Sequence, residues 1–306
     1  MSAESLVEEI VEDRESGASQ LTIKAARLFL KLLERKPSMG EVSRLARLLA
    51  EARPSMPSIA NLAYMVLGDV KRLTSTGMGL EEAVESAVRS AVKDYQRRLR
   101  DTIKEAVKLL SGYRCILTHS YSSTLATAIE LCEDLKIIVT ESRPGFEGVR
   151  LAERLASNGF DVTLIVDSAA SYILERGEVD AVVVGCDAIL DDCSIVNKIG
   201  TKMIALAARD TRTPFHVVTD LWKAAVHGFV FEEHPSEEVY GRGVEGISVR
   251  NPYFEKVPPR LISKFITEEG VLTPRMLREK LLELWSSLSP RPRLLSKNLS
   301  SNLFRL

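Results

Sequence analysis

The chain has 306 residues, of which 45% are hydrophobic and 27% charged, and its 41 basic and 42 acidic side chains leave a net charge of −1. This balance argues against the basic surface that binding to nucleic acid or an anionic membrane requires. No apolar run approaches the ~20 residues of a transmembrane helix, and the acidic N-terminus is unlike a signal peptide. We therefore expect a globular, cytoplasmic protein with no direct nucleic-acid or membrane partner.

The first 112 residues show helical periodicity and no convincing strand. Apolar residues recur at three- and four-residue intervals in segments near 21–33, 42–49, 59–73 and 80–110. Pro37, the 54–57 segment and the turn at Gly77 separate these segments, and Gly112 ends the longest one. The pattern predicts a helical N-terminal domain over residues 1–112.

From residue 113 onward, strand-like runs alternate with amphipathic helices. The predicted strands cover residues 115–118, 136–140, 162–166, 181–185 and 215–219, and the helices lie near 122–134, 147–158, 168–176 and 197–210. Such alternation is typical of βαβ units and a parallel, doubly wound sheet. We predict the α/β class, with a Rossmann-like domain over residues 113–285 that ends in a helix near 272–284. Residues 286–306 are interpreted as a C-terminal tail.

Several common catalytic and cofactor motifs are absent from the sequence. The four cysteines form no CxxC pair and have no histidine at metal-ligand spacing. No strand is followed by a GxGxxG, GxxxxGK[ST] or GxSxG motif. We therefore expect neither a metal nor a cofactor. Cys186 could be a reactive thiol beside Asp187, although a small buried residue that ends a strand is the favoured interpretation.

The stretch from residue 179 to 209 carries the strongest functional signal. A β-branched run at 181–184 predicts a strand buried on both faces, and Gly185 ends it. A carboxylate (Asp187), an amide (Asn197), an ammonium (Lys198) and a hydroxyl (Thr201) follow before an alanine-rich helix. Ligands of open α/β sheets bind at the carboxyl ends of strands. This mixture of groups suits a polyhydroxy ligand with an anionic end.

Two further loops follow predicted strands. The first holds Thr118, His119, Ser120 and Ser122, whose hydroxyls and backbone N–H groups could bind a phosphate. A serine that only caps the next helix is an equally weighted alternative, and His119 could be a structural histidine. The second loop holds Arg143, which could grip an anion or form a surface ion pair.

Six motifs occur in an order that resembles a known family: ILTHSYSSTLATAI, ESRPGFEGVRLAERL, VTLIVDSAA, VVVGCDAIL, NKIGT and NPYFEKVPP. The family unites the regulatory subunits of translation initiation factor 2B with isomerases that act on ribose-1,5-bisphosphate and methylthioribose-1-phosphate. The resemblance covers residues 16–283 approximately. It implies a helical domain followed by a Rossmann-like domain, and assembly into a homodimer or a larger oligomer.

By this resemblance, the isomerases of the family share a catalytic cysteine at the position where this chain has Ser120. They also share an Arg-Gly-Ala segment at the position where this chain has Ser16-Gly17-Ala18. Asp187 matches their second catalytic residue, and Asn197 and Lys198 match phosphate-binding positions. The resemblance implies a non-catalytic regulatory subunit that binds initiation factor 2 or sister subunits and keeps a sugar-phosphate or nucleotide pocket.

Two alternatives remain open at this point. One is a sugar-phosphate isomerase that uses Asp187 with an unfamiliar partner such as Cys186 or His119. The other is a scaffold with an empty pocket.

Overall fold

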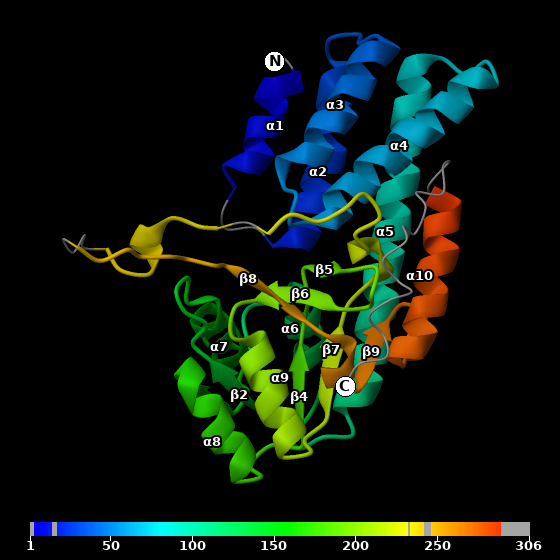
Figure 1. Cartoon of the computed structure of the whole chain (residues 1–306). Coiled ribbons are helices and arrows are strands. Elements are labelled where there is room, and N and C mark those ends of the chain that lie inside the picture. The colour runs from blue at the N-terminus through cyan, green and yellow to red at the C-terminus, as the bar shows by residue number, and fades with distance from the viewer. Residues whose placement is uncertain (1–2, 14–16, 232, 242–245, 289–306) are drawn as a thin grey trace, which may run out of the picture.

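A computed structural model of the chain describes residues 3–13, 17–231, 233–241 and 246–288 (Figure 1). The N-terminal part consists of helices α1 (Ala3–Val11), α2 (Ala18–Leu33), α3 (Met39–Ala52), α4 (Pro57–Ser75) and α5 (Leu80–Leu110). Local sequence sets several of their starts. Ser38 and Glu41 form a capping box before α3, and Pro57 occupies the first turn of α4, where no N–H is needed.

The N-terminal helices pack around one apolar core and stay attached to the rest of the chain. Helix α5 continues past this core and packs along α6 (Ser123–Glu130) and β9 (Lys264–Thr267). Trp222, from the second half of the chain, inserts into the helical core and places its ring 5.1 Å from that of Tyr95. The side-chain amide of Asn61 donates to the carbonyl oxygens of Trp222 and Ala224, at 2.7 and 2.9 Å.

The second half of the chain is built on a seven-stranded sheet. Its strand order is β10 (Gly270–Leu272), β9, β7 (Phe215–Val218), β4 (Ala181–Val184), β1 (Cys115–Thr118), β2 (Lys136–Thr140) and β3 (Val162–Ile165). All neighbours are parallel except β10, which pairs antiparallel with β9. The crossover helices are α6, α7 (Glu147–Ser157), α8 (Ala170–Glu175) and α9 (Thr201–Asp210). The predicted α/β class is confirmed.

A small antiparallel sheet, not predicted from the sequence, sits beside the main one. It consists of β5 (Ala188–Ile189), β6 (Ile195–Lys198) and β8 (Phe254–Val257). Asn197 and Lys198 therefore lie on a strand and not at the start of a helix, which corrects the predicted helix over 197–210. The β6 residues are all buried and pair with β8, which is more than fifty residues away in sequence. Local periodicity does not reveal such a long-range pairing.

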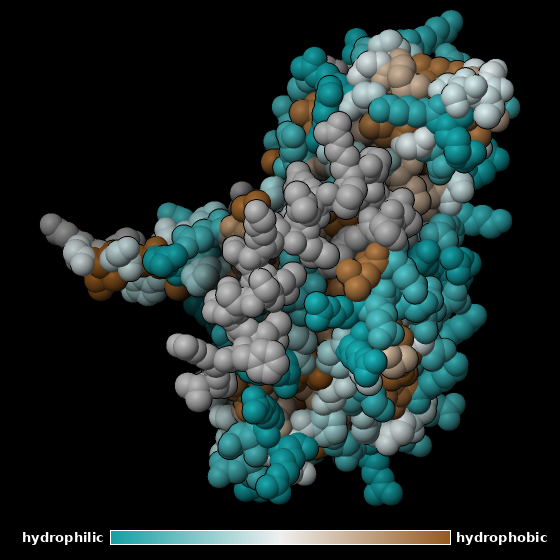
Figure 2. All heavy atoms as spheres, turned by 45° about the vertical axis from the view of Figure 1, so that its right-hand side comes forward, coloured by the Kyte–Doolittle hydropathy of each residue, from teal (hydrophilic) through white to brown (hydrophobic). Residues whose placement is uncertain are grey.

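An extended arm, formed by the described residues 226–231, 233–241 and 246–252, stands out from the body of the molecule between η2 (Leu221–Lys223) and β8 (Figure 1). Large hydrophobic side chains on it are exposed, and Figure 2 shows the arm projecting from the main surface. They are Val230, Phe231, Tyr240 and Ile247, with exposed fractions of 59%, 50%, 52% and 62%.

After β10 the chain enters the final helix, α10 (Pro274–Leu288), which extends beyond the predicted helix near 272–284. Most of the predicted tail, residues 289–306, lies outside the described residues. Within the described ranges, no helix is both long and apolar enough to span a membrane.

Candidate functional site

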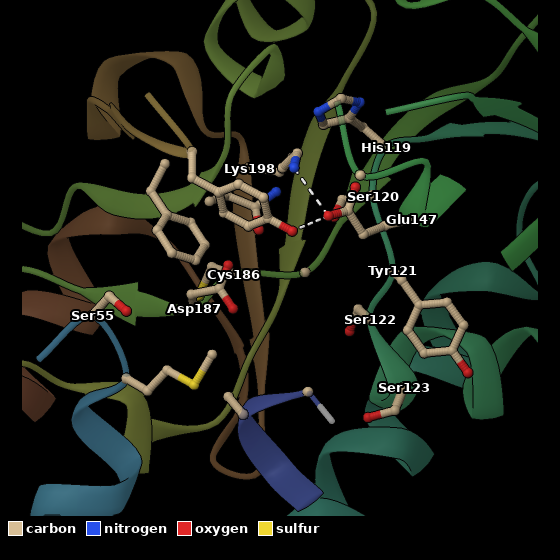
Figure 3. Close-up of a pocket in the computed structure, with 18 of the residues that line it drawn as sticks. Ser55, His119, Ser120, Tyr121, Ser122, Ser123, Glu147, Cys186, Asp187 and Lys198 are labelled. Atoms are coloured by element: carbon tan, nitrogen blue, oxygen red, sulfur yellow. Dashed lines mark hydrogen bonds and ion pairs between the residues drawn. The ribbon is translucent and has the colours of Figure 1, made fainter. Parts of the chain in front are cut away.

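A cavity of about 460 Å³ opens between the N-terminal helices and the carboxyl ends of strands β1 and β4 (Figure 3). From β1 the chain proceeds through β2 and β3 to one edge of the sheet, and from β4 through β7 and β9 to the other. The cavity thus lies at the topological switch point, where open α/β sheets bind ligands. Residues 119–124, 185–187 and 197–198 contribute to its wall.

Two helix N-termini contribute to the cavity wall. Helix α6 begins after Ser122, whose hydroxyl accepts from the N–H of Leu125 at 3.3 Å, and helix α2 begins after Gly17. The first N–H groups of a helix lack partners within it and attract anions. Gly185 allows α6 to approach β4, because a Cβ atom there would lie 2.6 Å from the Cβ of Ser122.

Asp187 is the carboxylate at the centre of the site. It lies deep in the fold, yet part of its surface opens into the cavity (Figure 3). Burial raises its pKa to about 6, against the opposing positive charges of Lys223 and Lys198. At neutral pH the two protonation states of this side chain are therefore both accessible. A carboxyl group with such a pKa can act as a general acid or a general base.

Lys198 forms a buried cluster with Glu147 and Tyr253 on another part of the wall. Its ammonium lies 3.0 Å from Oε1 of Glu147 and 3.3 Å from the ring centre of Tyr253, whose hydroxyl also donates to that carboxylate. Burial opposes ionisation of Glu147, but the charge of Lys198 and the hydroxyl of Tyr253 outweigh it and hold the pKa of Glu147 below its usual value. The cluster is therefore a buried ion pair whose ammonium group also contacts the face of the Tyr253 ring.

His119 is a structural histidine at the edge of the cavity. Its Nε2 lies 2.8 Å from the carbonyl oxygen of Ile199, which can only accept, so Nε2 carries the hydrogen. Its Nδ1 then accepts from the hydroxyl of Thr140 at 2.6 Å. Burial lowers the pKa of His119, which keeps the ring neutral. With both nitrogens engaged, His119 is a poor candidate for a proton-transfer partner of Asp187.

Cys186 is equally unsuited to that role. The residue is 3% exposed, and its thiol donates to the hydroxyl of Thr219 at 3.1 Å. Burial raises the pKa of Cys186 to about 12, against the nearby charge of Lys223. The thiol therefore stays protonated at neutral pH and is neither a nucleophile nor a proton acceptor.

The N-terminus of α9 is not available to a ligand, although the sequence places it next to the site. Oε1 of Glu255 accepts from the N–H groups of Gly200 and Lys202, at 2.7 and 2.9 Å. The chain thus supplies its own carboxylate where an anion would bind. Thr201 is also engaged internally, because its hydroxyl donates to the carbonyl of Lys198 and accepts from the amide of Asn197.

The structure places most of the predicted ligand-binding residues around one cavity. The residues that line it are His119, Ser120, Ser122, Asp187, Asn197 and Lys198. Thr118 lies outside the lining and is 1% exposed. Arg143 is also outside the lining, because its guanidinium donates to the carbonyl of Val239 at 2.8 Å and covers the ring of Phe146. It holds the arm in place and does not face the cavity.

Sequence reasoning missed several lining residues. Glu147 and Tyr253 stand within recognised motifs but gave no signal of their own, because their pairing with Lys198 joins distant segments. Arg53 comes from the N-terminal helices, where only helical periodicity was visible. Its Nη2 donates to the carbonyl of Asp13 at 2.6 Å, and its buried Nε has no hydrogen-bond partner among the described residues. Lys223 follows the last predicted strand and was also missed.

No group of three or more histidine, cysteine, aspartate or glutamate side chains is arranged to hold a metal ion in the part of the chain that the structure describes.

Comparison with known proteins gives this cavity a family context. Residues 11–274 match the profile of the initiation factor 2 subunit family. The chain belongs to that family. It is 36% identical over 218 residues to the ribose 1,5-bisphosphate isomerase of Archaeoglobus fulgidus, an alignment that covers 66% of this chain and 68% of the relative.

A second relative, the ribose 1,5-bisphosphate isomerase of Methanocaldococcus jannaschii, is 41% identical over 171 residues. That alignment covers 52% of this chain and 55% of the relative, so the likeness to it spans about half of each protein.

Solved structures of both branches of the family resemble the fold. The translation initiation factor eIF-2B of Pyrococcus horikoshii superposes with a TM-score of 0.75 at 25% identity, covering 89% of this chain and 97% of that one. The 5-methylthioribose 1-phosphate isomerase of the same organism gives a TM-score of 0.73 at 26% identity, covering 92% and 88%. The predicted family resemblance is confirmed.

These findings correct the expected role. The sequence interpretation favoured a non-catalytic regulatory subunit, mainly because Ser120 replaces the cysteine of the isomerases. That interpretation is wrong: the curated relatives that align with much of this chain are named as sugar-phosphate isomerases. The absence of one residue type weighs less than the similarity of the surrounding sequence.

Proposed function

We propose that the protein is an aldose–ketose isomerase of a phosphorylated pentose. The observation that carries this proposal is Asp187, a deeply placed carboxyl group with a pKa near 6 in a cavity lined by cationic side chains and helix N-termini. The relatives named as ribose 1,5-bisphosphate isomerases support the same substrate class.

The reaction sets a definite requirement for proton transfer. A cyclic aldose phosphate opens when the bond between its anomeric carbon and ring oxygen breaks and the ring oxygen gains a proton. Hydrogen then moves with its electron pair from the neighbouring carbon to the electron-deficient anomeric carbon. The hydroxyl on the neighbouring carbon loses its proton, and its O–H electron pair forms the carbonyl bond. One proton enters and one leaves, so the catalyst ends in its starting state.

We assign both proton steps to Asp187. As a carboxylic acid it donates to the ring oxygen, and the carboxylate so formed accepts the proton of the neighbouring hydroxyl. A pKa near 6 suits both steps, since neither form is too stable to react at neutral pH. This assignment removes the need for a catalytic cysteine. Ser120, which lines the cavity, can then serve as a hydrogen-bonding group for the sugar.

The phosphate groups have two sets of candidate partners. The N-termini of α2 and α6 offer backbone N–H groups, and Arg53 offers a donor without a hydrogen-bond partner among the described residues. Lys198 and Asn197 lie on strand β6 and offer an ammonium and an amide. A bisphosphate, with one phosphate group at each end, would use both sets and hold the sugar between them.

Turnover of a phosphorylated pentose tests the function directly. Purified protein should convert ribose-1,5-bisphosphate or methylthioribose-1-phosphate to the ketose at an enzyme-like rate, about 1 per second or faster. Phosphorus NMR follows both compounds without a coupling enzyme. The loss of turnover after chemical denaturation is the control. If neither compound is converted although at least one raises the melting temperature, the cavity binds sugar phosphates without catalysing the reaction, and the proposal is wrong.

We also propose that the protein is a homo-oligomer. The exposed apolar side chains of the arm favour this, because a monomer in water gains nothing from presenting Phe231 and Ile247 at 50% and 62% exposure. Light scattering should give a molar mass of at least twice the 33.9 kDa of one chain. A mass of one chain at micromolar concentration would contradict the proposal.

A further inference from the structure

The 3-10 turn η2 is anchored by two carboxylates. It spans Leu221–Lys223 and follows strand β7. Oδ1 of Asp220 accepts from the N–H of Trp222 at 3.1 Å, and both carboxylate oxygens of Glu268 lie within 3.3 Å of the N–H of Leu221. Glu268 is in turn paired with Arg98 of helix α5 at 2.8 Å. The turn is thus capped by Asp220 and is connected through Glu268 to Arg98 of the long helix.

Lys223, the last residue of this turn, lies in the wall of the cavity. The side chain is 5% exposed, and its ammonium donates to the carbonyl oxygen of Cys186 at 2.8 Å. That carbonyl immediately precedes Asp187 in the chain, and Lys223 and Asp187 both line the cavity. A lysine side chain is rarely buried unless its charge has a counterpart.

The charges in this region alternate from the helix to the cavity. Arg98 is followed by the Glu268 and Asp220 carboxylates, then by Lys223, and finally by Asp187. Burial raises the pKa of Glu268 to about 7, with a further contribution from the charge of Asp220. Burial likewise raises the pKa of Asp220, against the charge of Lys223. The positive charge of Lys223 thus acts on two carboxyl groups, those of Asp220 and Asp187.

Other charged groups also face Asp187. Lys198 on β6 stabilises its carboxylate form, as Lys223 does, while Glu147 on α7 opposes it. Lys198 is already paired with Glu147 at 3.0 Å, so much of its charge is neutralised locally. Lys223 has no carboxylate within ion-pair distance among the described residues. The positive charge of Lys223 is therefore less neutralised than that of Lys198 and is the stronger influence on the carboxylate of Asp187.

We propose that Lys223 is a positioning residue that sets the proton affinity of Asp187, and that the carboxylate-anchored turn η2 holds it in place to do so. Without this cation the buried carboxyl group would hold its proton too tightly to release it to the ring oxygen of the sugar. The proposal rests on the proposed isomerase function for its kinetic consequence alone. The effect on Asp187 is a property of the free protein.

The test measures the pKa of Asp187 directly in Lys223→Met, which keeps most of the length of the side chain and removes its charge. Carbon NMR of protein labelled at the aspartate carboxyl carbons follows the titration, and the signal of Asp187 is identified by its loss in Asp187→Asn. An opposite charge at close range lowers a carboxyl pKa by about 1–3. We expect the midpoint for Asp187 to move up by about one pH unit or more in Lys223→Met, and Lys223→Arg to restore it.

The same variant has a kinetic readout that a merely structural residue would not produce. The fall of kcat/KM on the alkaline side, which reports loss of the acid form of Asp187, should move to higher pH by the same amount, since the proton is held more tightly. Lys202→Met is the matched control, because Lys202 is exposed on α9 and does not line the cavity. It should leave both the titration and the pH profile unchanged.

If Lys223→Met does not fold, Asp220→Asn provides a second measurement with the opposite sign. Removing a negative charge beside Lys223 should lower the midpoint of Asp187. An unchanged midpoint in a folded Lys223→Met, or a lowered one, overturns the inference whatever the enzymatic activity. A raised midpoint in a protein that converts no sugar phosphate supports the inference and refutes the isomerase function.

Discussion

Asp187→Asn should abolish isomerisation, with kcat reduced by about 10³-fold or more. General acid–base catalysis by one positioned group contributes about 10²–10⁴-fold, and the proposed reaction uses this carboxyl group twice. An amide has the same shape but neither donates nor accepts a proton under these conditions. Phosphorus NMR of ribose-1,5-bisphosphate over hours measures the remaining rate. A variant that retains a tenth of the activity would show that another group transfers the protons.

Binding and stability provide the controls for this variant. The phosphate partners are untouched, so the sugar phosphate should still raise the melting temperature as much as it does for the unaltered protein. The stability at pH 7 should increase. The pKa of Asp187 is raised to about 6 in the folded state, so folding loses free energy as pH rises from the unfolded value of about 3.9 to about 6. Replacement by Asn removes that loss at pH 7 and makes little difference near pH 4.

Five of the seven strands of the main sheet could be predicted, because each is a short apolar run between turn signals, whereas β9 and β10 were not predicted. The predicted strands at 115–118 and 136–140 have the bounds found for β1 and β2, and those of β4 and β7 are one residue shorter than predicted. The burial of these strands on both faces makes the pattern strong. Strands β6 and β8 were missed because their pairing depends on a partner far away in sequence. Helix propensity near residue 201 extended the predicted helix backwards over β6.

The site residues that could be predicted from the sequence all lie in segments that follow a predicted strand. Asp187 and Ser122 follow parallel strands, so their convergence follows from the topology alone. Arg143 also follows a strand, but its side chain pairs with the arm, which no local pattern indicates. Arg53 and Lys223 reach the cavity from a helix end and a 3-10 turn. The burial that raises the pKa of Asp187 is a property of the folded chain and has no sequence signal.

Lys198→Met should be the most destabilising single change in the cavity wall. Removing one partner of a buried ion pair leaves the other charge without compensation, which costs about 3–5 kcal/mol. Here Glu147 would remain 7% exposed, with the hydroxyl of Tyr253 still donating to its carboxylate. Urea unfolding at pH 7 measures the loss. Lys256→Met is the matched control, since Lys256 pairs with Asp192 at a surface where both are about half exposed, and such pairs contribute about 0–1 kcal/mol.

A double variant separates the structural role of Lys198 from its role in binding. Lys198→Met with Glu147→Gln removes both charges, so most of the lost stability should return. The affinity for a sugar phosphate should stay reduced by about 10- to 150-fold, the equivalent of a lost charged hydrogen bond.

The pH dependence of stability gives a second check on the role of the Lys198 charge. In the unaltered protein the lowered pKa of Glu147 contributes stability above its unfolded value of about 4.3, and this contribution disappears as pH falls through the folded value. In Lys198→Met, burial raises that pKa instead, so the destabilisation should be largest at pH 7 and shrink as pH falls through the raised value, where Glu147 takes up a proton. A loss of stability that is equal at both pH values would mean that packing of the lysine side chain, and not its charge, supports this wall. Full recovery of affinity in the double variant would place the phosphate away from β6, at the N-termini of α2 and α6.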